Sequence, residues 1–269
     1  MILVELRAML RRPRTWVVIA LLDALPTLVA VLLAYTRIGP RPGQGPAFLS
    51  AVLTNGQLFP LAALAIVLPL FLPVAVAVIA GDAVAGEAQS GTLRYLLTRP
   101  VGRTTLLVAK LVSVVAFVLL AVVVVAGTAY LVGTRLLGSS TTVATGLSGT
   151  TLTQQDVVIR TTVAIGYVAL SMLGVAATAL FFSTITDSPL AATLGALALL
   201  IASSLLLTLD AAGALQPYLP TRYWLAFVDL FRDPIPTRDL LRGVGLQVVY
   251  VAVFLGAAWA NFSTKDITS

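Results

Sequence analysis

The stretch GDAVAGEAQSGTLRYLLTRPVGR, residues 81–103, interrupts a strongly apolar part of the chain. Apolar runs at 58–80 and 106–132 flank it, and each is long enough to cross a bilayer as a helix. A polar segment between two membrane spans lies in the aqueous phase, where another protein can bind it. This segment is therefore the first candidate for a functional site.

The composition is that of a membrane protein. The chain has 269 residues, of which 59% are hydrophobic and 10% are charged, whereas soluble domains carry about 25% charged residues. Backbone groups in lipid must be hydrogen-bonded within their own segment, so each long apolar run predicts a helix. The predicted spans are 16–35, 58–80, 106–132, 162–182, 190–209 and 244–262. The expected fold class is an all-α polytopic membrane protein of six spans, with 1–269 forming a single transmembrane domain.

Several kinds of chemistry are excluded by composition. The chain contains no cysteine and no histidine, which removes thiol nucleophiles, histidine bases and the usual zinc ligands. Neither of its two lysines stands in a phosphate-loop pattern, so the chain is not expected to hold ATP itself. With no carboxylate pair inside any span, an intramembrane enzyme is disfavoured. The net charge of +6 is attributed to orientation and anionic lipid headgroups, not to nucleic acid.

Residues 1–14 predict a short amphipathic helix on the membrane surface. Its apolar side is Ile2, Leu3, Leu6 and Leu10, and its polar side is Glu5, Arg7 and Arg11. Pro13 ends the pattern. The alternative is a basic leader that only sets topology. Four arginines precede the first span and two follow it, so both termini are expected in the cytoplasm.

The outer connections differ in character. Residues 37–45 and 138–153 are rich in turn-forming residues and are expected to be passive. The connection 210–242 is predicted to hold one or two short helices that dip into the outer interface. Its aromatic residues are Tyr218, Tyr223, Trp224, Phe227 and Phe231. Aromatic side chains beside charges are typical of the membrane–water boundary.

Within the polar segment, a helix-compatible run is followed by a proline. Its apolar face is Leu93, Leu96 and Leu97, which alternate with Thr92, Arg94 and Tyr95. Pro100 ends the run, and Arg103 and Lys110 stand where the next span begins. A short helix that is continuous with a transmembrane helix can transmit a push because it is rigid.

The order of these residues resembles the signature of the permease subunits of type-2 ATP-binding-cassette (ABC) exporters. In that family a Glu-x-x-x-Gly-Thr-Leu-x-x-Leu-Leu-x-x-Pro-x-x-Arg pattern follows the second span and forms a coupling helix on the ATPase subunit. Six spans, an N-terminal amphipathic helix and a helical outer segment also match, so the resemblance covers essentially the whole chain. The tail 261–267 resembles the family's ending but carries less charge.

The resemblance implies that residues 81–105 form the cytoplasmic coupling segment. The ATPase-coupling residues would be Glu87, Gly91, Thr92, Leu93, Arg94, Leu96, Leu97, Pro100, Arg103 and Lys110. Glu87 and Arg103 would contact the ATPase or brace the loop; the alternative is that they pair with each other or are solvated. The implied partners are two ABC ATPase subunits, which would bind ATP and Mg²⁺, a second permease copy or homologous permease, and membrane lipids. No cofactor is expected in this chain, and the implied location is the bacterial inner membrane.

The candidate residues of a transport path are Asp23, Pro69, Pro73 and Gly195. Asp23 lies roughly 10 Å into the first span, where an ionisable group either contacts cargo or has a structural partner. Pro69 and Pro73 share a helix face and predict a kink in the second span. Gly195 belongs to a small-residue stripe on the fifth span that permits close packing. In the family, the second and fifth spans of two protomers line the path.

Two classes of transporter remain after these exclusions. The favoured one is an ATP-driven exporter permease for hydrophobic or amphipathic compounds, because the path holds so few charges. The alternative is an ion-coupled secondary transporter or channel, which predicts several intramembrane charges and an inverted repeat. The sequence shows one clear intramembrane charge and no repeat.

Overall fold

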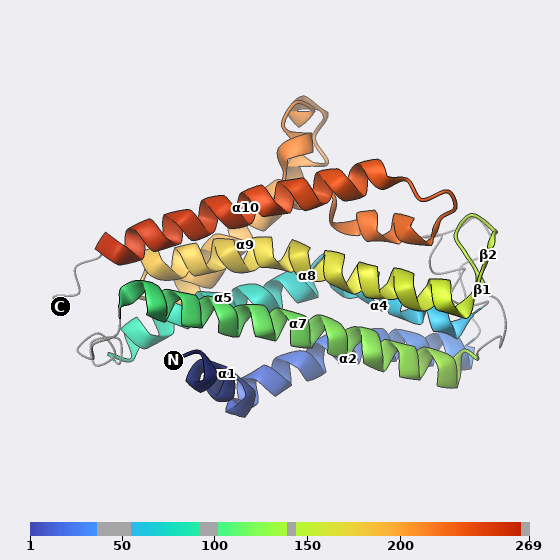
Figure 1. Cartoon of the computed structure of the whole chain (residues 1–269), viewed down its shortest axis with the longest axis horizontal. Helices are drawn as coiled ribbons and strands as arrows, with labels where there is room; N and C mark the ends of the chain where they lie inside the picture. The colour runs from blue at the N-terminus through green and yellow to red at the C-terminus, as the bar shows by residue number, and fades with distance from the viewer. Residues whose placement is uncertain (37–54, 92–101, 139–143, 265–269) are drawn as a thin grey trace.

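The computed structural model describes residues 1–36, 55–91, 102–138 and 144–264. The long helices lie along the long axis of an elongated bundle (Figure 1). Its elements are α1 (Ile2–Arg11), α2 (Pro13–Thr36), η1 (Gly56–Leu58), α4 (Phe59–Val67), α5 (Phe71–Gln89), α7 (Arg103–Leu136), β1 (Ala144–Thr145), β2 (Thr151–Leu152), α8 (Gln154–Ile185), α9 (Pro189–Leu206), η2 (Asp210–Ala212), η3 (Gln216–Tyr218), η4 (Trp224–Phe231) and α10 (Thr237–Thr264).

Within the described ranges, six helices are long and apolar enough to cross a membrane: α2, α5, α7, α8, α9 and α10. The prediction of an all-α polytopic membrane protein is therefore confirmed. The start of α1, the end of α5, the start of α7 and the end of α10 lie at one end of the bundle (Figure 1). We call this the termini end.

Helix α8 lies at the centre of the bundle and packs against α5, α7, α9 and α10. Many of its buried side chains are small, among them Gly174, Ala176, Ala177 and Ala179. Lipid tails are as apolar as leucine, so helices in a membrane associate mainly through close packing. Small side chains on α8 allow its neighbours to approach closely.

The second span is broken, not merely kinked, which corrects the prediction of one helix over 58–80. Helix α4 ends at Val67 and α5 begins at Phe71. Pro69 lies in the turn between them and cannot donate to the helix ladder. Pro73 is the third residue of α5, a position whose N–H has no intrahelical partner in any helix, so it does not disturb α5.

The connection 138–153 was expected to be passive, but its described part is ordered. Strands β1 and β2 form a small hairpin in which Thr145 pairs with Thr151. The hairpin is tied to the end of η4, because the Leu147 N–H donates to the Phe231 carbonyl at 3.0 Å. Glycine-rich composition alone did not reveal this tertiary contact.

The aromatic side chains of η4 are buried in the protein, so they do not form an exposed aromatic surface; their assignment to the membrane–water boundary stays a prediction. Trp224 is 5% exposed, and Phe227 and Phe231 are 0% and 1% exposed. They belong to the main core, where η4 contacts α8 and α10. Tyr218 differs from them, since 68% of it is exposed. The described connection holds three short 3-10 helices, η2, η3 and η4, where one or two helices were predicted.

At the end opposite the termini, two glycines bring backbones together. A Cβ on Gly133 of α7 would meet the carbonyl oxygen of Gly56, and a Cβ on Gly56 would meet that of Gly133. The Gly56 N–H also donates to the Gly138 carbonyl at 3.0 Å. The start of η1 and α4 is thus fixed against α7.

We expect Gly133→Leu to destabilise the protein by about 1–3 kcal/mol, because overpacking a close backbone contact forces the two elements apart. Gly127→Leu on the same helix is the matched control, since a Cβ there meets nothing within 4 Å. The measurement is the thermal unfolding midpoint of each variant in lipid nanodiscs. Equal midpoints for the two variants would contradict the proposed contact.

Candidate functional site

The candidate site surrounds the connection between α5 and α7 at the termini end. Helix α5 continues to Gln89 and α7 begins at Arg103, so the first part of the predicted coupling segment is helical. Gly91 has φ +70°, and its N–H donates to the Ala88 carbonyl at 3.1 Å. A left-handed glycine is a common way to end a helix. Thr92, Leu93, Arg94, Leu96, Leu97 and Pro100 lie outside the described residues.

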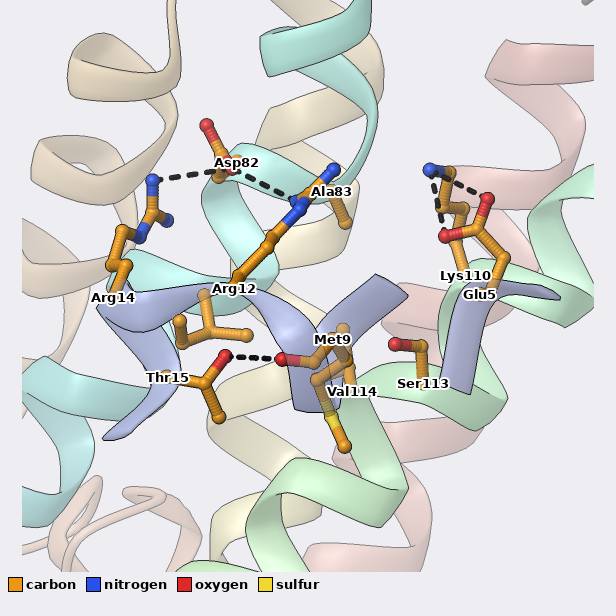
Figure 2. A pocket seen from close by; sticks show the side chains of 11 residues that line it. Glu5, Met9, Arg12, Arg14, Thr15, Asp82, Ala83, Lys110, Ser113 and Val114 are labelled. Atoms are coloured by element: carbon orange, nitrogen blue, oxygen red, sulfur yellow. Dashed lines mark hydrogen bonds and ion pairs between the residues drawn. The ribbon is translucent and has the colours of Figure 1, made fainter. Parts of the chain in front are cut away.

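Lys110 joins three helices through its ammonium group. It lies on α7, is 4% exposed, and contacts Glu5 of α1 with 3.0 Å between Nζ and Oε1. The same ammonium forms an ion pair with Glu87 of α5. Figure 2 shows Lys110 of α7 and Glu5 of α1 facing each other. We call these three residues the Lys110 cluster.

The side chains of the Lys110 cluster are largely buried. The side chains of Lys110, Glu5 and Glu87 are 5%, 16% and 16% exposed. A charge buried this far is costly unless it is paired and hydrogen-bonded. The position of α1 and that of the last turn of α5 are therefore coupled to α7.

A second ion cluster lies beside the first. Asp82 of α5 contacts Arg14 at 3.2 Å and Arg12 at 3.8 Å, and Arg14 also donates to the Val78 carbonyl at 3.1 Å. A cavity between the two clusters is lined by Glu5, Arg12, Arg14, Asp82 and Lys110, with Met9 and Thr15 (Figure 2). These contacts fix the junction of α1 and α2 against α5.

The junction of α1 and α2 is itself closed by side chains. Thr15 donates to the Met9 carbonyl and Trp16 donates to the Leu10 carbonyl, each at 2.8 Å. The last carbonyls of a helix have no intrahelical partner, and these two bonds satisfy them. Pro13 begins α2 directly after Arg12, which stops α1 and sets the angle between the helices.

The start of α7 is fixed to the end of α10. Arg103 donates to the Ser263 carbonyl at 3.0 Å and to the Phe262 carbonyl at 3.5 Å. A guanidinium at the carboxyl end of a helix satisfies free carbonyls and complements the helix dipole. Beneath this contact, a small apolar cluster contains Val84, Leu106, Leu107, Leu180 and Phe262.

Helix α5 is also tied to α8 just before the connection. The Ser183 hydroxyl donates to the Gly81 carbonyl at 2.7 Å and accepts from the N–H groups of Val84 and Ala85. A Cβ on Gly81 would lie 2.7 Å from the Thr193 hydroxyl of α9, so glycine lets α5 and α9 approach closely. Both ends of the connection are thus held by the body of the bundle.

The structure brings together only part of the predicted coupling set. Glu87 and Lys110 meet in the Lys110 cluster, while Arg103 contacts α10. Sequence reasoning missed Glu5 and Asp82. Glu5 is the only acid in the basic N-terminal segment 1–14, and Asp82 directly follows an apolar span. An isolated acid in either setting was a signal that a cation could lie opposite: buried Lys110 for Glu5, and the more exposed Arg12 and Arg14 for Asp82.

The four candidate path residues do not form one site. Asp23 accepts a hydrogen bond from Thr128 of α7 at 2.7 Å. Pro69 is exposed at the break between α4 and α5, whereas Pro73 is buried. On α9, a Cβ on Gly195 would lie 3.1 Å from the Phe182 ring of α8.

Six membrane helices, a short helix α1 packed on α2 and α7, and a connection braced on both sides define a multi-pass membrane protein. The sequence profile of the ABC-2 family transporter protein matches residues 2–267. No curated protein matches the chain. The chain therefore belongs to the ABC-2 family and is a membrane permease of the ABC transporter class, which associates with ABC ATPase subunits.

We expect Lys110→Met to destabilise the protein by about 3–5 kcal/mol, because Glu5 and Glu87 would be left buried without their cation. Adding Glu5→Gln and Glu87→Gln should recover part of the loss, since the uncompensated charges are then removed. Arg135→Met is the control, an exposed cation on the same helix. Chemical denaturation in mild detergent measures all variants, and a Lys110→Met protein as stable as Arg135→Met would refute the role of the cluster.

Proposed function

We propose that this chain is the permease subunit of an ATP-driven exporter. Two copies, or one copy and a homologous permease, enclose a path for a hydrophobic or amphipathic compound such as a drug, an antibiotic or a lipid. Two separate ATPase subunits bind ATP and Mg²⁺ and drive the movement. The chain lies in a bacterial inner membrane with its termini end in the cytoplasm.

The observation that carries the proposal is the bracing of the connection 90–102. Its two ends are tied to α1 by the Lys110 cluster, to α8 by Ser183 and to α10 by Arg103. A connection whose two ends are held in this way passes a force to several helices at once. Such bracing suits a segment on which an external subunit pushes, and it supports the assignment of Leu93, Leu96 and Leu97 as the contact with the ATPase.

The surface of α9 supports the assignment of a second permease. Its small-residue stripe of Ala191, Ala198 and Ala202 is exposed in the single chain. Large apolar residues on the same helix, Leu194 and Leu205, are 56% and 59% exposed. Small residues let helices of two protomers pack closely in a membrane. The exposed parts of α9 and of the α4–α5 break then face the path between protomers.

The hydrogen bond from Thr128 favours a structural role for Asp23. The bond joins α2 to α7, and the Thr128 hydroxyl also lies 2.9 Å from the Val124 carbonyl. A carboxyl group that holds two helices together does not need to contact cargo. Family membership likewise favours the ATP-driven class over an ion-coupled transporter or channel.

The test of coupling is the double variant Leu96→Asp with Leu97→Asp, in a complex with the ATPase that co-purifies with the chain. We expect ATP hydrolysis to become uncoupled from export, because carboxylates cannot enter an apolar groove. Leu96→Met with Leu97→Met is the matched control, since it conserves volume. The assay follows ATP hydrolysis and export of a fluorescent lipophilic dye from the same proteoliposomes. Dye export at the native rate with both aspartates would overturn the assignment.

A further inference from the structure

A polar cavity lies between the junction of α1 and α2 and the last turns of α5. Its volume is about 410 Å³. The polar residues and the glycine that line it are Arg12, Arg14, Asp82, Gly86, Glu87 and Ser90. Ligand pockets in proteins commonly have about 300–1,000 Å³, so this cavity has room for a polar group of several atoms.

The cavity lies between two ion clusters of opposite net charge. On the side of the α1–α2 junction, two guanidinium groups, Arg12 and Arg14, share the single carboxylate of Asp82. On the other side, the two carboxylates of the Lys110 cluster share a single ammonium group. The first cluster therefore carries an excess positive charge and the second an excess negative charge. We call this cavity the dipolar pocket.

The two guanidinium groups can still donate to a ligand. The side chains of Arg12 and Arg14 are 56% and 44% exposed. A guanidinium has five N–H donors, and Arg14 uses its own on Asp82 at 3.2 Å and on the Val78 carbonyl at 3.1 Å. Arg12 lies 3.8 Å from Asp82, which is beyond hydrogen-bonding distance. Guanidinium groups bind phosphate oxygens particularly well, so this side of the pocket suits a phosphate.

The opposite side of the pocket can accept from a cation. Asp82 uses Oδ2 for Arg12 and Arg14, and in the described part of the chain no donor bonds to its Oδ1. A Cβ on Gly86 would lie 2.5 Å from Oδ1, so glycine at this position leaves the carboxylate uncovered. The Asp82 side chain is 21% exposed. A protonated amine, with three N–H donors, suits this oxygen.

The dipolar pocket lies where α2 enters the membrane. Trp16, two residues after Arg14, is 49% exposed, and tryptophan is enriched at the membrane–water boundary. Positions 14, 21 and 28 are seven residues apart and therefore share one face of α2. On that face, Leu21 and Leu28 are 66% and 55% exposed. An apolar track thus leads from the pocket along α2 towards the middle of the membrane.

We propose that the dipolar pocket binds the headgroup of a phosphatidylethanolamine lipid. The lipid phosphate accepts from Arg12 and Arg14, its ammonium group donates to Asp82, and an acyl chain lies along Leu21 and Leu28. A purely anionic headgroup would leave Asp82 without a new partner and would meet the excess negative charge of the Lys110 cluster. The bound lipid is a further brace between the α1–α2 junction and α5. This site goes beyond the proposed function, because it involves neither the ATPase nor the transported compound.

The direct test is a lipid competition on the native chain in a mild detergent. Phosphatidylethanolamine, phosphatidylcholine and phosphatidylglycerol with identical acyl chains are added in equal amounts, and native mass spectrometry identifies the first lipid bound. We expect phosphatidylethanolamine to exceed each of the others about tenfold, the effect of one charged hydrogen bond. Phosphatidylcholine has a cation without N–H donors, and phosphatidylglycerol has no cation.

Two variants provide the second arm. Arg12→Gln with Arg14→Gln should lower the affinity for phosphatidylethanolamine about tenfold, because the phosphate loses its charged donors. Arg7→Gln with Arg11→Gln is the matched control, since it removes two exposed arginines of α1 that do not line the pocket. Asp82→Asn should reverse the preference in favour of phosphatidylglycerol, because two guanidinium groups then remain without their carboxylate. A loss of structure alone would not reverse a preference.

The lipid site is refuted if the native chain binds the three lipids equally or prefers either of the other two. It is also refuted if the Arg12 and Arg14 variant binds phosphatidylethanolamine as well as its control does, or if Asp82→Asn keeps the native preference. Glycerophosphoethanolamine has the same headgroup without acyl chains. If it displaces the lipid at equal concentration, the ligand is a soluble phosphoethanolamine compound and the lipid assignment is wrong. Because the native-chain competition uses neither a variant nor the ATPase, its result is independent of the coupling assignment.

Discussion

The ammonium group of Lys110 has to be paired, because it lies almost entirely out of contact with solvent. Its two carboxylate partners come from different helices: Glu5 from α1 and Glu87 from the last turn of α5. Moving either helix away from α7 would separate buried charges, which is far more costly than sliding apolar side chains past one another. The cluster thus makes α1, α5 and α7 one mechanical unit around the connection 90–102. The proposed role of that connection as a lever depends on this constraint.

A second constraint operates in the middle of the bundle. Backbone groups cannot be left unpaired against lipid, so a broken helix is tolerated in a membrane only where protein or a cavity covers the break. Here the break between α4 and α5 lies beside a cavity that is lined by the end of α9 and the start of η4. Helix α9 has 18 residues, about 27 Å at 1.5 Å per residue, and the chain then turns through η2 and η3. The break between α4 and α5 and the segment that leads into η4 meet at this cavity, which Trp224 also lines.

The sequence predicted the parts of the fold that depend on long apolar runs. Every span except the second forms one continuous helix. Helices α7, α8 and α10 extend beyond the apolar runs because the polar residues Arg103, Gln154 and Thr237 still propagate them, whereas α9 ends at Leu206, before the predicted end at residue 209. The break at Pro69 was anticipated only as a kink, since a proline by itself does not reveal whether neighbouring elements will cover free backbone groups. The burial of Phe227 and Phe231 was missed for a related reason, because aromatic residues suit both a core and an interface.

The candidate site was only partly predictable. Glu87 and Lys110 were indicated by the resemblance to the family signature, but the pairing of Lys110 with Glu5 joins residues 105 positions apart and follows from tertiary packing alone. The glycine at position 91 of the motif has a physical explanation. The residue after α5 has a left-handed backbone conformation, which favours glycine. Arg103 was expected to contact the ATPase or to brace the loop, with pairing to Glu87 or solvation as the alternative; in the structure it donates to carbonyls at the end of α10. No local pattern indicates which distant helix end will receive a guanidinium.

The most direct test of the central claim is the distance between α1 and the start of α7 during the nucleotide cycle. Because the chain contains no cysteine, spin labels can be placed at Arg7→Cys and Thr105→Cys, both exposed positions. Pulsed electron paramagnetic resonance of the complex with its ATPase would compare nucleotide-free and ATP-trapped states. If α1 and α7 move as one unit, the label-to-label distance within one chain, measured with labelled chains diluted by unlabelled ones, will be narrow and the same in both states. A distribution that shifts or splits when ATP binds would contradict the account.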